Sequence, residues 1–211
     1  MPEESLRALA ERIGGARRAA KESKDYELMR VLVETMKLRL GFSITDEAFQ
    51  LKALVEYDEA LAAFDRAMST SSPALRRIGL EIGRRHAEKS AEYAYLGKDV
   101  VGALYAHMII AGHFLPNLGK ENEAYELLCE LVDEATQLLA ETPGVDRRIQ
   151  RLLMNCRAHM ITLVLDFEQR EREFDGLVAE FKVDLESLGL EDEDWAKTLI
   201  GRAEDHLRRR R

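Results

Sequence analysis

The chain has 211 residues, of which 46% are hydrophobic and 33% charged, a size and composition that suit one compact domain. Its 39 acidic residues outnumber its 31 basic ones, and the formal net charge of −8 argues against general affinity for nucleic acid or anionic membranes. Four Pro and 13 Gly are too few to punctuate an all-β chain. We therefore expect a single all-helical domain over residues 1–211.

The start of the chain and its most apolar stretch lack the marks of export or membrane insertion. Met1 to Lys24 is charged throughout and has no apolar core segment of a secretory signal. Val100 to Leu115 is shorter than the roughly 20 residues of a membrane span and contains two histidines. A reducing compartment suits Cys129 and Cys156, which form no disulfide framework. We expect a cytoplasmic protein with Cys156 in its core and Cys129 off the buried stripe of its helix.

Apolar residues recur at intervals of three and four along most of the chain, as in helices with one buried face. The clearest stripe runs from Ala124 to Leu139 and ends before Pro143 and Gly144, which stop a helix. With the other breaks, the pattern predicts eight or nine helices, near residues 3–21, 25–40, 45–69, 73–95, 98–114, 120–141, 145–168, 170–188 and 191–209. Turns this short join antiparallel neighbours, so we expect an all-α fold of helical hairpins, either an open solenoid or a compact array.

The last predicted helix has complementary charges at its two ends. Glu191 to Asp194 open it, and Arg208 to Arg211 close it. Acid at the start and base at the end complement the helix dipole. We therefore interpret the arginine run as a solvated helix end and not as a nucleic-acid-binding tail.

One segment of the chain resembles a repeat family. Tyr57 to Met68, with Pro73 shortly after it, resembles the second helix of a tetratricopeptide repeat. Ala60 and Ala67 are small at the positions where two helices of such a repeat approach closely. Phe64 fills the gap between those helices.

Two further segments carry parts of the same pattern. Leu118 to Ala124 is similar to the turn and second helix of another repeat, although Leu131 stands where the family has a small residue. Glu173 to Phe181 keeps only the aromatic positions, and the matching segments are spaced wider than the repeat's roughly 34 residues. The resemblance implies a tetratricopeptide-like array with long, divergent helices. Such arrays bind a peptide or protein segment on a concave face, and a terminal repeat without a polar outer face can also self-associate.

The five histidines form no recognisable metal motif. His107 and His113 are six residues apart, which rotates them by roughly 240° on a helix, so they cannot hold one ion together from an intact helix. Each is interpreted as a hydrogen-bonded core or pocket-edge residue. A tertiary site that joins His86 to His107 or His113 stays open, because their helices are sequential.

Carboxylates and small residues also give no catalytic pattern. Acidic residues on the predicted helix near 120–141 fall on its polar face, so we expect them to be solvated; they are Glu123, Glu126, Glu130, Asp133 and Glu134. Gly14, Gly15 and Gly41 lack the spacing of a phosphate-binding loop. We expect no catalytic residue, no metal ligand and no cofactor.

Tyrosine and asparagine side chains crowd the middle of the chain, where they could line a groove for an extended segment or a small ligand. The predicted binding residues are Tyr93, Tyr105, His107, His113, Asn117 and Asn122. We expect a non-catalytic protein–protein interaction module that binds a partner segment on a surface formed by the middle helices. An equal alternative for the tyrosines is that they only bridge core and solvent.

Two other functions remain alternatives. One is a metal-dependent enzyme built on a helical bundle, with His86, His107 or His113 and nearby carboxylates as ligands. The other is a small-ligand sensor whose pocket lies among the same helices. Bound metal would favour the first, and a ligand retained through purification would favour the second.

Overall fold

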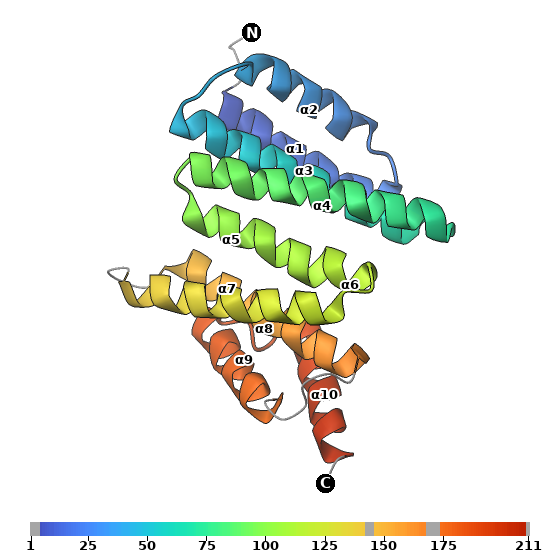
Figure 1. Ribbon diagram of the computed structural model, residues 1–211, viewed down its shortest axis with the longest axis vertical. Coiled ribbons are helices and arrows are strands. Elements are labelled where there is room, and N and C mark those ends of the chain that lie inside the picture. Colours follow the sequence, from blue (N-terminus) through green and yellow to red (C-terminus); the bar gives the residue numbers. More distant parts are fainter. Residues whose placement is uncertain (1–4, 142–145, 168–173, 210–211) are drawn as a thin grey trace. The chain divides into compact units, whose positions relative to one another are not determined.

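The computed structural model describes residues 5–141, 146–167 and 174–209, which form helices and their connections without a strand (Figure 1). The expected all-α fold is confirmed. The chain divides into two compact units, the first ending at Leu118 and the second beginning at Gly119. Each unit has its own packing. The single domain expected over residues 1–211 stays a prediction.

The helices agree with the ranges expected from the apolar spacing to within about one turn. The first unit contains α1 (Leu6–Ser23), α2 (Glu27–Leu40), α3 (Asp46–Ser69), α4 (Pro73–Leu96), α5 (Val100–Ile109), the π-helical turn η1 (Ile110–Phe114) and α6 (Leu115–Asn117). The second contains α7 (Glu121–Glu141), α8 (Arg147–Phe167), α9 (Phe174–Leu188) and α10 (Asp194–Arg208). None of these helices is both long enough and apolar enough to cross a membrane.

Some of the expected features lie outside the described residues. They are the stop at Pro143 and Gly144, the first residues of the helix expected near 170, and the two ends of the chain at residues 1–4 and 210–211.

Polar side chains cap the starts of α1, α3, α4 and α5 in the first unit. Thr45 Oγ1 accepts a hydrogen bond from the backbone N–H of Ala48 at 3.2 Å, and Ser72 Oγ accepts one from Leu75 at 3.4 Å. Pro73 follows Ser72 at the first helical position, where a missing N–H costs nothing. These caps satisfy N–H groups that a helix start leaves without a partner, so the connections can be short.

α3 and α4 form the central hairpin of the first unit and share its largest interface. A Cβ added to Gly79 would lie 2.9 Å from the Cβ of Ala67, and one added to Gly83 would lie 2.5 Å from the ring of Phe114 and 3.1 Å from the carbonyl oxygen of Ala60. The two helices therefore approach as closely as alanine and glycine allow. The close-packing role expected for Ala60 and Ala67 is confirmed.

α1 and α2 pack together, and α1 also packs along α3. An apolar cluster holds the three helices; its most buried members include Leu9, Ile13, Val33, Met36 and Val55. Arg17 of α1 adds an ion pair, since its Nε donates to Asp58 Oδ1 of α3 at 2.9 Å. Burial raises the pKa of Asp58, although Arg17 acts in the opposite direction.

The helix after α4 runs farther than the sequence indicates. A break was expected at Pro116 to Gly119, but the helical backbone continues through Pro116 to Asn117. The π-helical turn η1 lies just before Pro116. A π turn does not use the i→i−4 hydrogen bond, which is the bond that a proline cannot make. The prediction therefore places the end of this helix too early.

The second unit is organised around α8, which contacts α7, α9 and α10. Cys156 is buried in its core, as expected, whereas Cys129 is partly buried. Arg157 of α8 binds two acidic residues of α9, with Nε 3.0 Å from Glu180 and Nη1 2.6 Å from Asp184. The five carboxylates expected on the polar face of α7 are all exposed, which confirms their solvation.

The glycine contacts predict opposite effects of two alanine substitutions. Gly83→Ala forces the ring of Phe114 to move and should lower the free energy of unfolding by about 1–3 kcal/mol. Gly15→Ala in α1 is the control: its Cβ meets nothing within 4 Å, so higher helix propensity should raise stability by about 1 kcal/mol. Urea unfolding followed by circular dichroism measures both. Equal effects of the two variants would contradict the close α3–α4 approach.

Candidate functional site

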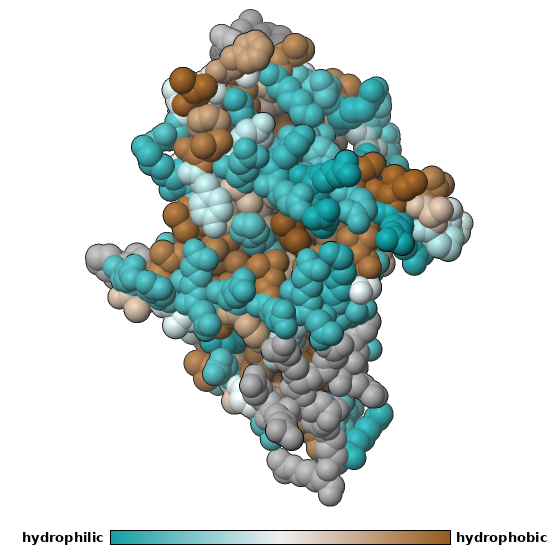
Figure 2. All heavy atoms as spheres, viewed as in Figure 1, coloured by the Kyte–Doolittle hydropathy of each residue, from teal (hydrophilic) through white to brown (hydrophobic). Residues whose placement is uncertain are grey.

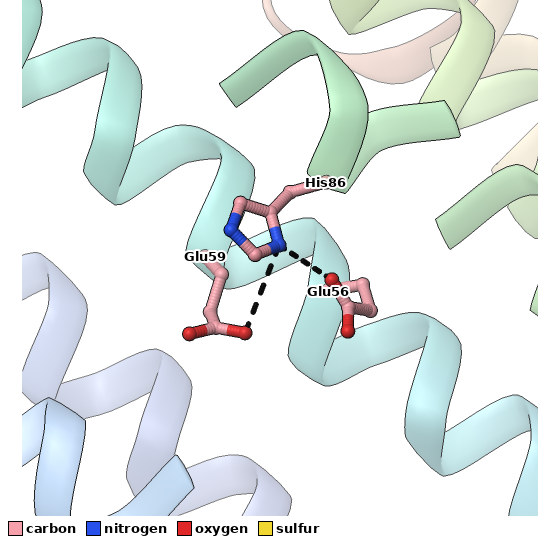
Figure 3. Close-up of side chains that lie close together, drawn as sticks. All are labelled: Glu56, Glu59 and His86. Atoms are coloured by element: carbon pink, nitrogen blue, oxygen red, sulfur yellow. Dashed lines mark hydrogen bonds and ion pairs between the residues drawn. The ribbon is translucent and has the colours of Figure 1, made fainter. Parts of the chain in front are cut away.

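A histidine and two glutamates meet on the α3–α4 hairpin (Figure 3). Glu56 and Glu59 lie one turn apart on α3, and His86 reaches them from α4. His86 Nδ1 is 2.6 Å from Glu56 Oε2 and 3.8 Å from Glu59 Oε2. The side chains are 11%, 22% and 25% exposed for Glu56, Glu59 and His86. Among the described residues they are the one group of three potential metal donors whose ligand atoms lie within 4.8 Å of one another.

Lys37 of α2 brings a positive charge to this cluster. Its Nζ lies 3.2 Å from Glu59 Oε2 and 3.5 Å from Glu34 Oε1. Burial alone would lower the pKa of Lys37, but the neighbouring carboxylates, Glu59 first among them, outweigh burial and raise it. Glu59 Oε2 is itself buried, and its ion-pair partner is the ammonium group of Lys37. This carboxylate oxygen therefore lies between an ammonium group and the imidazole of His86.

A cavity of about 410 Å³ adjoins the cluster. Glu56 belongs to both the cluster and the cavity wall. Lys37, which pairs with Glu59 of the cluster, also lines the wall. The rest of the wall is largely apolar and comes from α2, α3, α4 and the α2–α3 connection; it consists of Met36, Leu40, Gly41, Phe42, Ile44, Lys52, Val55 and Tyr93. The cavity is therefore an apolar pocket with charged groups on one side.

The mouth of this cavity carries exposed hydrophobic side chains. Phe42 is 102% exposed and Ile44 is 81% exposed, and both lie in the α2–α3 connection. Figure 2 shows hydrophobic residues at the upper left of the first unit, where α2 leads into α3. Gly41 opens this connection with a φ of 48°, a conformation that glycine adopts without strain. The turn thus places an aromatic and a branched side chain in solvent beside the pocket.

Of the six predicted binding residues, only Tyr93 lines the cavity. Tyr93 also stacks on Phe49, with ring centroids 6.2 Å apart. His107 lies against Tyr95, with their ring centroids also 6.2 Å apart. Asn122 is exposed on α7 and belongs to the second unit.

Tyr105, His113 and Asn117 occupy another part of the first unit. The ring of His113 packs on Phe64 at 4.8 Å between centroids, and Asn117 Nδ2 donates to the carbonyl oxygen of His113 at 2.8 Å. Tyr105 lies near enough to Tyr57 to add to the effect of burial, which raises the pKa of Tyr57 to about 12. Tyr105 and His113 are partly buried and Asn117 is engaged in the local fold, and the binding surface expected at the six residues stays a prediction.

Sequence reasoning missed Glu56 and Glu59, although a signal for them was present. The small residues predict that Ala60 approaches Gly83 in an antiparallel hairpin. Counting one turn in opposite directions from that contact reaches Glu56 on α3 and His86 on α4. The tertiary site that the sequence leaves open joins His86 to His107 or His113. The structure pairs His86 with the two glutamates instead.

Comparison of the chain with protein-family models, with curated proteins and with solved structures gives no match.

The environment of His113 predicts a pH dependence of stability. Burial lowers the pKa of His113, whereas Asp65 acts to raise it. The pKa of His113 in the folded state lies below the unfolded value of about 6.5. The contribution of His113 to the free energy of unfolding is therefore complete above that pH and is lost on acidification. We expect His113→Gln to reduce the loss of unfolding free energy between about pH 7 and about pH 5.

The control for this prediction is His206→Gln in α10, which replaces a histidine of the second unit. Urea unfolding at several pH values gives the slope for each protein. A His113→Gln variant with the same pH slope as the unsubstituted chain would contradict the prediction.

Proposed function

We propose that the chain is a non-catalytic protein-binding module whose first unit takes a segment of a partner protein. The observation that carries the proposal is the apolar cavity with Phe42 and Ile44 exposed at its mouth. The partner segment would place an apolar side chain in the cavity and cover both residues. Tyr93, one of the predicted binding residues, would contact that side chain from α4.

Exposed apolar area at a pocket mouth favours association. Burial of apolar surface contributes about 25 cal/mol per Å², and aromatic side chains are enriched at the centres of interfaces. Phe42 and Ile44 are largely exposed, and a partner that covers them removes their apolar surface from water. The feature therefore supports a binding role for the α2–α3 connection.

The charges beside the cavity indicate which segment would fit. Glu34, Glu56 and Glu59 lie near Lys37, and the cavity wall also carries Lys52, so three carboxylates accompany two ammonium groups in and beside the cavity. A segment with a Lys or Arg next to its apolar anchor would complement this excess. We therefore propose an apolar residue followed or preceded by a basic one as the recognised element.

The resemblance to tetratricopeptide repeats adds independent support. Ala60, Ala67 and Phe64 stand at the family's packing positions, and proteins of that family bind peptide segments. The cavity lies among α2, α3 and α4, and of these helices only α4 carries a predicted binding residue, Tyr93. The proposal keeps the expected class of function and moves its centre toward the α2–α3 connection.

A displayed library of random peptides tests this proposal. We expect enriched peptides to share an apolar residue adjacent to Lys or Arg, and Phe42→Ser to weaken their binding at least about tenfold, as for a central aromatic contact. Fluorescence polarisation with a synthetic peptide measures the dissociation constant. Phe42 is fully exposed, so its replacement should leave the circular dichroism spectrum unchanged.

Val183→Ser provides a matched control, because Val183 is an exposed apolar residue of α9 in the second unit. Its substitution should leave peptide affinity unchanged. Equal affinity of the peptide for Phe42→Ser and the unsubstituted chain would show that this cavity is not the binding site. A library without enriched peptides would contradict the protein-binding role itself.

A small-ligand sensor is the second candidate function, favoured by the size of the cavity. Its volume of about 410 Å³ falls within the roughly 300–1,000 Å³ range of small-molecule sites. Native mass spectrometry of protein purified without a tag separates the two candidates. A retained small molecule that Val55→Trp displaces, by filling the cavity, would favour the sensor over the peptide-binding module.

A further inference from the structure

We infer that Glu56, Glu59 and His86 form a binding site for a divalent transition-metal ion such as Zn²⁺. The inference rests on the polar cluster, which shares Glu56 with the cavity wall, and not on the apolar part of the cavity. Two helices, α3 and α4, supply the three donors. Both belong to the tightest hairpin of the first unit, so the donors are held by rigid elements.

The donor set selects the class of metal. Mg²⁺ and Ca²⁺ prefer sites built entirely from oxygen atoms, whereas an imidazole nitrogen suits zinc, iron, nickel and copper. One histidine and two carboxylates are a mixed nitrogen and oxygen set. Three protein ligands would leave a position for water or another group, as in zinc sites that are open to a fourth ligand.

The distances already lie close to those of a bound ion. Metal–ligand bonds of about 2.0–2.2 Å place tetrahedral ligand atoms about 3.3 Å apart. The two measured separations from His86 Nδ1, 2.6 Å to Glu56 and 3.8 Å to Glu59, fall on either side of that value. Rotations of the side chains suffice to equalise them. His86 would then carry its proton on Nε2 and offer Nδ1 to the metal (Figure 3).

Glu59 and Lys37 provide a second, independent observation. The buried Oε2 of Glu59 pairs with Lys37 and also lies 3.8 Å from His86 Nδ1, where a metal ion would contact both donors. Lys37 supplies a positive charge 3.2 Å away, but an ammonium group carries one charge where a metal ion carries two. A divalent ion would balance the two glutamates, so Lys37 acts as a competitor for the same carboxylate.

Isothermal titration of tag-free, chelator-treated protein with Zn²⁺ tests the inference. We expect about one equivalent to bind, and Glu59→Gln and His86→Gln each to weaken binding at least about tenfold, since changes beyond the direct ligands already cost 10–100-fold. Lys37→Met should bind Zn²⁺ more tightly, because it removes the competing charge. A merely structural role of the cluster would not predict tighter Zn²⁺ binding by Lys37→Met.

Glu88→Gln is the matched control, because Glu88 is an exposed carboxylate of α4 that pairs with Arg84 outside the cluster. It should leave Zn²⁺ affinity unchanged, and circular dichroism verifies the fold of every variant. Titration with Co²⁺ adds a spectroscopic readout: visible absorption bands should appear in the unsubstituted chain and disappear in Glu59→Gln.

Two outcomes would overturn the metal site. One is the absence of Zn²⁺ binding, and the other is an equal affinity of the unsubstituted chain, Glu59→Gln and His86→Gln. Failure here is distinguishable from failure of the peptide-binding proposal, because Glu59 and His86 do not line the cavity. Phe42→Ser, which should lose peptide binding, is expected to retain Zn²⁺ binding in full.

Discussion

The close approach of α3 and α4 is the constraint on which the first unit depends. Gly79 meets Ala67, and Gly83 meets Ala60 together with the ring of Phe114. Any larger side chain at these glycines would separate the helices. The same approach sets the register that brings His86 opposite the glutamates of α3, so one packing requirement determines both the core and the cluster.

Most of the helices could be predicted from the sequence, because apolar spacing and capping residues are local signals. Thr45, Ser72 and Pro73 mark their helix starts without any tertiary information. The end of the helix at Pro116 could not be predicted in this way, since the preceding π turn accommodates the proline. The same limit applies to Arg17, whose ion pair with Asp58 depends on the packing of α1 against α3.

The candidate site was harder to predict than the fold because its members come from different helices. Tyr93 was selected for its residue type and lines the cavity, whereas Tyr105, His113 and Asn117 take part in local packing. Glu59 lies within the segment from Tyr57 to Met68 that resembles a tetratricopeptide repeat, and Glu56 directly precedes that segment. Only the pairing of α3 with α4 distinguishes Glu56 and Glu59 from ordinary surface acids.

Lys37 belongs to the wall of the cavity and also touches Glu59 in the cluster. A ligand in the cavity or in the cluster that moves this ammonium group therefore changes the free energy of binding at the other. Thermodynamic linkage makes such an effect reciprocal: the factor by which one ligand alters the affinity of a second is the factor by which the second alters the first. A single lysine would thus couple the two proposed sites.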